Sequence, residues 1–529
     1  MKQDSEHTVV ILGAAYGGRR CAQTLAQILP PGWRLVVIDR NTHFNHAYVF
    51  PRYTVLSVHA PKAFVPYIKS FLPGPFVVQS TQLTQPIHST QSTRPGQNIT
   101  PATQPTSNTS PTKSERLTSP PTPQADGTST STPVKVDTSP STHSTPTSPT
   151  KETRTEENTQ GERREERIWI HGLVTSLTRD TVTFTRLSTN GPSYPSSDLF
   201  SPTHSTNSHP RSSSLSKNNI IAQNGNGHCN TKNIDGSDEG ICREVLGEET
   251  IHFDYIVYAL GATLPGPVDV WGGELHPQIG HQNQPLGHKI RGVRFMVAQA
   301  EVYKKVKSVI VVGGGALGIQ TATDIKDVYP DKEVTLVHSR AQLLPIYPME
   351  MHEGILQNLI KMNIQVILSE RVIEWPLHPG IPSTPNSKTI RTTSGRTLTS
   401  DLVLVCTGQK PATTLMSSLL PESVDEKTRR IRVRPTMQLE RIGWENWFAI
   451  GDCAETGSIQ AGHVAWGQGM IAARNVVRLI KKEGDLEVYE KHGPAIKVTL
   501  GLNNAIISNS DGVRETGEGV EDLHADMLW

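Results

Sequence analysis

Two apolar runs in the chain each break abruptly into a row of small residues. The first covers residues 8–12 and is followed by Gly13, Ala14, Ala15, Tyr16, Gly17 and Gly18. The second covers residues 308–312 and is followed by Gly313, Gly314 and Gly315, with Gly318 closing the row. Each pattern predicts a buried strand, a tight turn and the start of a helix whose N–H groups can bind a dinucleotide pyrophosphate. The sequence therefore predicts an α/β protein with two Rossmann-like, doubly wound domains.

The hydrophobic pattern continues in the order that such folds require. Apolar positions at helical spacing follow the first turn over 17–29, and a second strand over 34–39 ends in Asp39. After the second turn we expect a helix up to residue 328 and a strand over 332–338. Further strands are predicted over 168–174, 181–184, 251–259, 401–408 and 447–455, and a last helix over 464–481.

Two long stretches lack any such pattern. Residues 79–165 are dominated by Ser, Thr, Pro, Gln and charged residues, and residues 188–245 are similarly polar. Chains of this composition cannot bury enough apolar area to offset their conformational entropy. Both stretches are therefore predicted to be disordered insertions that project from one domain as long loops. The acidic, Gly-rich tail after residue 500 is predicted to be poorly ordered as well.

Composition narrows the class of protein. The 529 residues are only 35% hydrophobic and carry a net charge of +1, which gives no support for sequence-specific nucleic-acid binding. The five cysteines include no C-x-x-C pair, which argues against a disulfide framework, a metal site or a dithiol relay. The polar N-terminus has no signal-peptide core and no apolar run reaches membrane-spanning length, so a cytoplasmic protein is expected.

Several separated motifs, in this order, resemble the two-dinucleotide flavoprotein oxidoreductases. The motifs are Gly318 to Ile325, Glu333 to Ser339, Leu368 to Val372, Leu404 to Gly408 and Ile450 to Ala454. These oxidoreductases share the fold of glutathione reductase, and within them the chain most resembles the apoptosis-inducing factor 2 branch, which includes ferroptosis suppressor protein. The resemblance covers most of the chain outside the two insertions.

The resemblance implies a flavin domain that is discontinuous in sequence and a nicotinamide domain inserted into it. The FAD-binding domain is expected over 1–78, 166–187, 246–300 and 411–480, around the insertions 79–165 and 188–245, with the NAD(P)-binding domain over 301–410 and a partly disordered C-terminal region over 481–529. The resemblance also implies FAD as a tightly bound cofactor and NADH or NADPH as co-substrate. Acceptors in this branch are typically quinones.

On the flavin side, Gly13, Ala15 and Gly18 occupy the three fingerprint positions, and Ala15 departs from the usual glycine. Its methyl group is tolerable if φ stays negative, although it crowds the diphosphate. A carboxylate at Asp39 can accept both ribose hydroxyls of the adenosine half, and the alternative is a solvated acid at a strand end.

Three more flavin contacts follow from the resemblance alone. Arg52 matches a position that reaches the cofactor, and Val174 matches one whose backbone meets the adenine. Asp452 matches the Gly-Asp aspartate that binds the ribityl chain, and the helix after it points its N-terminus at the flavin ring. That positive helix end would stabilise an anionic reduced flavin.

On the nicotinamide side, Gly313, Gly315 and Gly318 complete the second fingerprint without substitution. The strand at 332–338 ends without the acid that favours NADH. Ser339 and Arg340 can instead accept a 2′-phosphate, which favours NADPH, and a plain surface charge is the alternative for Arg340.

Gln320 and His463 are the candidate catalytic residues. Many relatives carry Glu at the position of Gln320, beside the nicotinamide. Gln keeps hydrogen-bonding ability but loses any role in proton transfer, which bears on quinone reduction more than on hydride transfer. His463, at the start of the last helix, lies where the resemblance locates the flavin ring, and a structural role is its alternative.

The predicted function is a FAD-dependent oxidoreductase that passes hydride from NAD(P)H to FAD and then electrons to a quinone-like acceptor. One alternative is a redox-switched signalling or cell-death effector of the apoptosis-inducing-factor type, with little turnover. Another is a monodehydroascorbate or ferredoxin reductase. Peripheral association with the mitochondrial outer membrane or with lipid droplets is compatible with the sequence, and the oligomeric state stays open.

Overall fold

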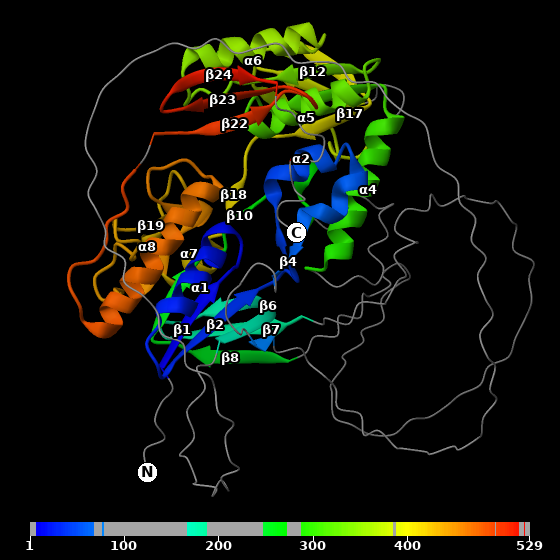
Figure 1. The fold of residues 1–529 in the computed structure, drawn as a ribbon. Helices are drawn as coiled ribbons and strands as arrows, with labels where there is room; N and C mark the ends of the chain where they lie inside the picture. Colours follow the sequence, from blue (N-terminus) through cyan, green and yellow to red (C-terminus); the bar gives the residue numbers. More distant parts are fainter. Residues whose placement is uncertain are drawn as a thin grey trace, which may run out of the picture. The chain divides into compact units, whose positions relative to one another are not determined.

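A computed structural model gives the fold (Figure 1) and describes residues 7–67, 77–78, 167–187, 247–271, 287–383, 388–491, 493–517 and 523. The two predicted insertions, 79–165 and 188–245, lie outside these residues.

The first dinucleotide unit is built on one sheet of eight strands. Its order is β20-β9-β1-β2-β6-β7-β8, with β5 also paired to β6. The strands are β1 (His7–Leu12), β2 (Trp33–Asp39), β5 (Val77–Val78), β6 (Arg167–Leu177), β7 (Thr181–Arg186), β8 (Glu248–His252), β9 (Tyr255–Tyr258) and β20 (Trp447–Ala449). Strands β20, β9, β1, β2 and β6 run parallel, and β7 and β8 extend the sheet as an antiparallel hairpin.

The second unit repeats the parallel core of the first. Its sheet has the order β13-β12-β11-β17, formed by β11 (Ser308–Val312), β12 (Glu333–Val337), β13 (Gln365–Ile367) and β17 (Leu402–Val405). All neighbours in this sheet are parallel. The order β17-β11-β12-β13 is the counterpart of β9-β1-β2-β6, so the predicted fold class, two Rossmann-like units, is confirmed.

Helices pack against the sheets, and successive side chains of a central strand such as β1 alternate between two hydrophobic clusters, one on each face of the sheet. The helices are α1 (Tyr16–Ile28), α2 (Phe50–Tyr53), α4 (Lys289–Lys305), α5 (Ala316–Val328), α6 (Met349–Lys361), α7 (Thr414–Leu419) and α8 (Gly462–Lys481). In β1, Val9 and Ile11 pack with α1 and α8, whereas Val10 and Leu12 face a second cluster on the other side of the sheet. This alternation is what a strand buried on both faces requires. Among the described helices, none is long and apolar enough to span a bilayer.

Shorter elements complete the chain. The remaining strands are β3 (His43–Asn45), β4 (Phe64–Pro66), β10 (Ala262–Thr263), β14 (Val372–Glu374), β15 (Lys388–Thr392), β16 (Thr397–Ser400), β18 (Lys410–Pro411), β19 (Ile431–Arg432) and β21 (Ala454–Glu455). The 3₁₀ helices are η1 (Ala47–Val49), η2 (Ser57–Ala63), η4 (Gly266–Val268), η5 (Pro421–Ser423) and η6 (Gly451–Cys453).

The prediction of a poorly ordered tail after residue 500 is wrong for residues 505–516. Strands β22 (Ile496–Thr499), β23 (Ala505–Asn509) and β24 (Gly512–Thr516) form an antiparallel sheet that lies against α5 and α6 (Figure 1). Val498 and Ile506 are fully buried in the core of the second unit. The Gly-rich, acidic composition concealed this sheet because its order depends on apolar contacts with helices far away in the sequence.

Helices α1 and α8 cross with almost no side-chain layer between them. A Cβ atom on Gly469 of α8 would lie 2.4 Å from the carbonyl oxygen of Gly17 in α1. The helices can approach this closely only because both positions are glycine. The contact holds α8, and with it the preceding turn that carries Asp452, against the start of α1.

Replacing Gly469 with Ala should therefore force the two helices apart. We expect the free energy of unfolding to fall by about 1–3 kcal/mol, as for other overpacked contacts. Gly467 of the same helix has no atom within 4 Å of the added Cβ, so Gly467→Ala is the matched control. The control should be neutral or stabilising, because Ala favours a helix by up to about 1 kcal/mol over Gly. Denaturant unfolding of both variants measures this, and equal effects would contradict the close-packing account.

Candidate functional site

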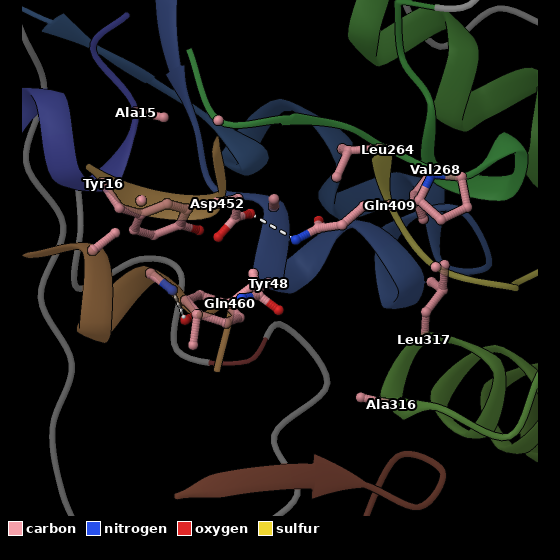
Figure 2. Close-up of a pocket in the computed structure, with 18 of the residues that line it drawn as sticks. Ala15, Tyr16, Tyr48, Leu264, Val268, Ala316, Leu317, Gln409, Asp452 and Gln460 are labelled. Atoms are coloured by element: carbon pink, nitrogen blue, oxygen red, sulfur yellow. Dashed lines mark hydrogen bonds between the residues drawn. The ribbon is translucent and has the colours of Figure 1, made fainter. Parts of the chain in front are cut away.

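One cavity of about 390 Å³ brings the two glycine turns together. Its lining includes residues 15–18 at the start of α1 and residues 315–317 at the start of α5. Figure 2 shows Ala15 and Tyr16 on one side of the cavity and Ala316 and Leu317 on the other. Asp452 and Gln320 line the same space. Its volume falls in the range of sites that hold small molecules, about 300–1,000 Å³.

The two turns have the same backbone geometry. A Cβ atom on Gly18 would lie 1.9 Å from the carbonyl oxygen of Gly13, and one on Gly318 would lie 1.9 Å from that of Gly313. Both Gly13 and Gly313 have positive φ, at +88° and +126°. Glycine is required at these positions because a side chain would strain the backbone and collide with it.

Both helices begin at the cavity without a side-chain cap. The N-cap residues are Ala15 for α1 and Gly315 for α5, and neither makes a side-chain cap hydrogen bond. The first N–H groups of each helix are therefore available to an anion. Ala15 has φ −72°, so its methyl group fits the turn without backbone strain. A Cβ on Gly315 would meet no atom within 4 Å, which leaves open space above the second turn.

The residue at the end of the second strand binds the glycine turn in both units. In the first, the Ala14 N–H donates to Asp39 Oδ2 at 2.6 Å, and the Asn41 N–H donates to Asp39 Oδ1 at 2.6 Å. In the second, the Gly314 N–H donates to His338 Nδ1 at 3.0 Å. Burial raises the pKa of Asp39, whereas burial lowers the pKa of His338 and favours its neutral form. An imidazole thus takes the structural place of the acid.

Asp452 lies in the cavity on the turn between β20 and α8. Its Oδ2 accepts a hydrogen bond from the Gln409 side-chain amide at 2.7 Å (Figure 2). Burial raises the pKa of Asp452, and the bond from Gln409 opposes that shift. Gly451 before it has φ +74° and donates its N–H to Gln468 Oε1 at 2.8 Å. Gln409, which sequence reasoning missed, follows the Thr-Gly motif at 407–408, and that motif was its only local signal.

The N-terminus of α8 carries a partner that the sequence did not predict. The Gly462 N–H donates to the hydroxyl oxygen of Tyr48 at 2.6 Å, and both residues line the cavity (Figure 2). The Tyr48 ring packs edge-on against Tyr16, at 5.2 Å between centroids. A tyrosine hydroxyl therefore meets the helix end that we expected to face the flavin ring. Tyr48 is far from α8 in sequence, so no local pattern could reveal the contact.

Gln320 lies on α5 one turn after Ala316 and lines the cavity. Its amide Nε2 donates to Thr499 Oγ1 at 3.1 Å. The C-terminal sheet thereby fixes the orientation of this side chain. The amide can offer a hydrogen bond to a ligand, but it cannot exchange a proton with one.

Nine of the expected site residues are not among those that line the cavity. Five of them belong to the two glycine turns or to the strand end behind the first turn: Gly13, Ala14, Asp39, Gly313 and Gly318. The other four are Arg52, Val174, Arg340 and His463. Arg52 is fully buried and donates to Asp324, so its guanidinium is directed into the protein rather than to the cavity. Val174 packs against the hydrophobic core beneath the first sheet, and Arg340 and His463 are exposed. Arg52 thus departs from the expected contact because a buried carboxylate, distant in sequence, binds it instead.

The cysteines that the structure describes do not form a reactive centre. Cys21, Cys406 and Cys453 are free and buried. Cys406 lines the cavity, but burial raises the pKa of its thiol to about 12, so it stays protonated at neutral pH. Within the described part of the chain, no group of His, Cys, Asp and Glu could hold a metal ion.

Comparison with known proteins identifies the family. The model of the pyridine nucleotide-disulphide oxidoreductase family matches residues 191–469, just over half of the 529 residues. The chain belongs to this family. Membership confirms FAD and a nicotinamide nucleotide as its cofactors, and the chain is an oxidoreductase.

Individual relatives agree with this assignment. The chain is 28% identical to Fe-regulated protein 8 of Mycosarcoma maydis over 535 residues, covering 100% of this chain and 96% of that protein. It is 30% identical to ferroptosis suppressor protein 1 of Homo sapiens over 268 residues, covering 49% of this chain and 65% of that protein. The branch expected from the sequence is confirmed. The solved structure of a NAD-dependent persulfide reductase from A. fulgidus matches with a TM-score of 0.51 and 14% identity. The match covers 94% of this chain and 63% of the reductase chain, so the two proteins share a fold.

The residues present fit the two cofactors of the family. Two uncapped helix N-termini open into one cavity, as two pyrophosphates require. The first turn has Asp39 behind it and Asp452 beside it (Figure 2), whereas the second has open space above Gly315 and no acid at its strand end. The first turn therefore suits FAD and the second suits a nicotinamide nucleotide.

The buried His46 beside Tyr16 should make the stability of the fold depend on pH. The Tyr16 hydroxyl and His46 Nδ1 lie 3.2 Å apart, and burial, with a smaller effect of Arg19, lowers the pKa of His46 from 6.5 to about 4. A folded-state pKa below the unfolded value means that stability is present above pH 6.5 and is lost as the pH falls towards 4.

We expect the free energy of unfolding to decrease between pH 6.5 and 4, because the folded state disfavours the imidazolium. His46→Gln, which cannot titrate, should make this decrease shallower. Denaturant unfolding at a series of pH values measures both slopes. Identical slopes for the wild type and the variant would rule out His46 as a contributor.

Proposed function

We propose that this oxidoreductase transfers electrons from NADPH or NADH to a quinone. FAD supplies a two-electron carrier between the nicotinamide nucleotide and the acceptor. The observation that carries the proposal is that both glycine turns open into one cavity, so that two dinucleotides bound there would meet. Holding the two reactants in contact is the main requirement for hydride transfer.

In this proposal, the chain's own residues bind the two nucleotides and orient their rings. The N-termini of α1 and α5 bind the two pyrophosphates, Asp39 binds the adenosine ribose of FAD, and Asp452 binds its ribityl chain. Gln320 orients the nicotinamide with its side-chain amide, which Thr499 holds in place. His338, Ser339 and Arg340 leave the second site without an acidic side chain, which favours NADPH.

The chemistry of the cavity favours a neutral acceptor. Asp452 is the only side chain with a full charge among the described lining residues, and most of the others are apolar. A quinone is planar and neutral, whereas an anionic acceptor would be repelled by Asp452. A disulfide acceptor would need a reactive thiol, and the Cys406 thiol is buried and protonated. The resemblance to the ferroptosis suppressor branch also implies a quinone, and it keeps peripheral membrane attachment open.

An anaerobic titration tests the function. We expect the purified full chain to be yellow, to be bleached by NADPH or NADH, and to regain its colour when a short-chain quinone is added. Ferredoxin and monodehydroascorbate serve as the comparison acceptors. A colourless protein that FAD does not reconstitute would refute the proposal. Bleaching without reoxidation by any quinone would favour the redox-switch alternative.

A substitution at Gly315 tests which turn binds the nicotinamide nucleotide. Gly315 has φ −87° and space for a Cβ, so Gly315→Val should lower the melting temperature of the nucleotide-free protein only slightly, through the weaker N-cap preference of Val. The added side chain would occupy the space above the turn, and we expect NADPH to bind at least about tenfold more weakly. FAD content, which depends on the first turn, is the internal control. Unchanged NADPH affinity, measured by titration calorimetry with NADP⁺, would contradict the assignment.

A further inference from the structure

A fully buried ion pair links α2 to α5. The Arg52 Nε donates to Asp324 Oδ2 at 2.9 Å, and the two side chains are 1% and 0% exposed. The Arg52 Nη2 also donates to the carbonyl oxygen of Gly501 at 2.7 Å. One guanidinium therefore joins three segments that are far apart in the sequence: α2, the first helix of the nicotinamide unit, and the turn after β22.

The same face of α5 makes three contacts with the C-terminal segment or with α2. Gln320, Asp324 and Asp327 are spaced at i, i+4 and i+7, so they lie along one side of the helix. Gln320 bonds to Thr499, and Asp327 Oδ2 accepts the Leu502 N–H at 2.6 Å. A Cβ on Gly501, which has φ +78°, would lie 2.6 Å from Asp327 Oδ2. The segment 499–502 is therefore closely packed against α5.

The pair is adjacent to two walls of the cavity. Pro51, next to Arg52 in α2, lines the cavity from one element, and Gln320, one turn before Asp324 in α5, lines it from another. A change in the separation of α2 and α5 would therefore change the width of the space in which the two cofactors meet.

Stability alone does not explain why a charged pair is kept here. Removing two charges from water costs more than their attraction commonly returns, and an apolar pair of similar volume is often as stable. Asp324 Oδ1 has no hydrogen-bond partner among the described residues, so the carboxylate depends on Arg52 for compensation. Burial, opposed by Arg52 and reinforced by the neighbouring Asp327, raises the pKa of Asp324 to about 6. What the pair adds is directional: a planar guanidinium fixes both the distance and the angle between its partners.

We propose that Arg52 and Asp324 are a positioning pair that sets the spacing of α2 and α5, and with it the alignment of the nicotinamide nucleotide against the flavin. This role rests on the proposed function. It also gives Arg52 a function through Asp324 and Gly501 rather than through direct contact with FAD.

The test compares the wild type with R52K, with R52M/D324L, and with the control R391M. R52K keeps the charge but loses the planar fork, and R52M/D324L replaces the pair by apolar side chains that can preserve the fold. Arg391 forms an exposed ion pair with Glu374 in the nicotinamide unit, at 3.2 Å and with exposures of 52% and 63%. Each protein is assayed for melting temperature, FAD content, the rate of flavin reduction at saturating NADPH, and amide hydrogen exchange.

We expect R52M/D324L to retain FAD and a melting temperature near that of the wild type. Its limiting rate of flavin reduction should fall by roughly 10–100-fold with little change in the half-saturating NADPH concentration, because misalignment affects the reaction more than binding. The limiting rate of R52K should lie between those of the wild type and R52M/D324L. Amide exchange over 50–54 and 499–502 should accelerate in both variants and not in R391M.

Two results would overturn the proposal. One is a limiting rate within twofold of the wild type in a fully flavinated R52M/D324L variant. The other is unchanged exchange over 50–54 and 499–502 in both variants. The exchange measurement does not need turnover, so it tests the pair even if the wild type is not reduced by a nicotinamide nucleotide. Failure of the wild type to be reduced would count against the proposed function and not against the pair.

Discussion

In each dinucleotide unit, the first helix meets its strand through two glycines that touch backbone to backbone. A methyl group on Gly18 or on Gly318 would lie 1.9 Å from the carbonyl oxygen of the preceding turn glycine, Gly13 or Gly313. Only this close approach lets α1 and α5 begin beside the carboxyl ends of their strands, where their free N–H groups reach the cavity. In the proposed function, cofactor orientation, and therefore electron transfer, would depend on these two contacts.

Segments that are distant in sequence then close the space between the turns. Helix α8 brings Asp452 and Gly462 to the first turn through the glycine contact with α1. The C-terminal sheet holds α5 through Thr499 and Leu502, and Arg52 joins the two sides. The two Rossmann-like units are thus connected by a small number of directional contacts as well as by apolar packing.

A site residue could be predicted from sequence where its contacts are local in sequence, and not where its partner is distant in sequence. The glycine turns and the positions of Asp39 and Asp452 were predictable because each position is set by neighbours in the same strand–turn–helix segment. The partner of Arg52, the hydrogen bond of Tyr48 with α8 and the bond of Gln320 to Thr499 were not, because each joins residues that only the tertiary fold brings together. The same reason applies to β23 and β24, whose short strands gain their order from α6 rather than from their own composition.

The family and the fold could be recognised from motifs, but the roles of individual residues depend on geometry. His338 is an example, since its sequence position indicates only that an acid is missing. The structure adds that its imidazole accepts the Gly314 N–H, as Asp39 accepts that of Ala14. The second turn is therefore held without a negative charge at the end of its strand.

The most direct test of the account is an experimental structure of the full chain with FAD and the non-reducing nucleotide NADP⁺. We expect density for both in the cavity between α1 and α5, with the flavin and nicotinamide rings in van der Waals contact and Asp452 beside the ribityl chain. Density that places the two rings in separate pockets, or a flavin outside the cavity beyond reach of Asp452, would contradict it.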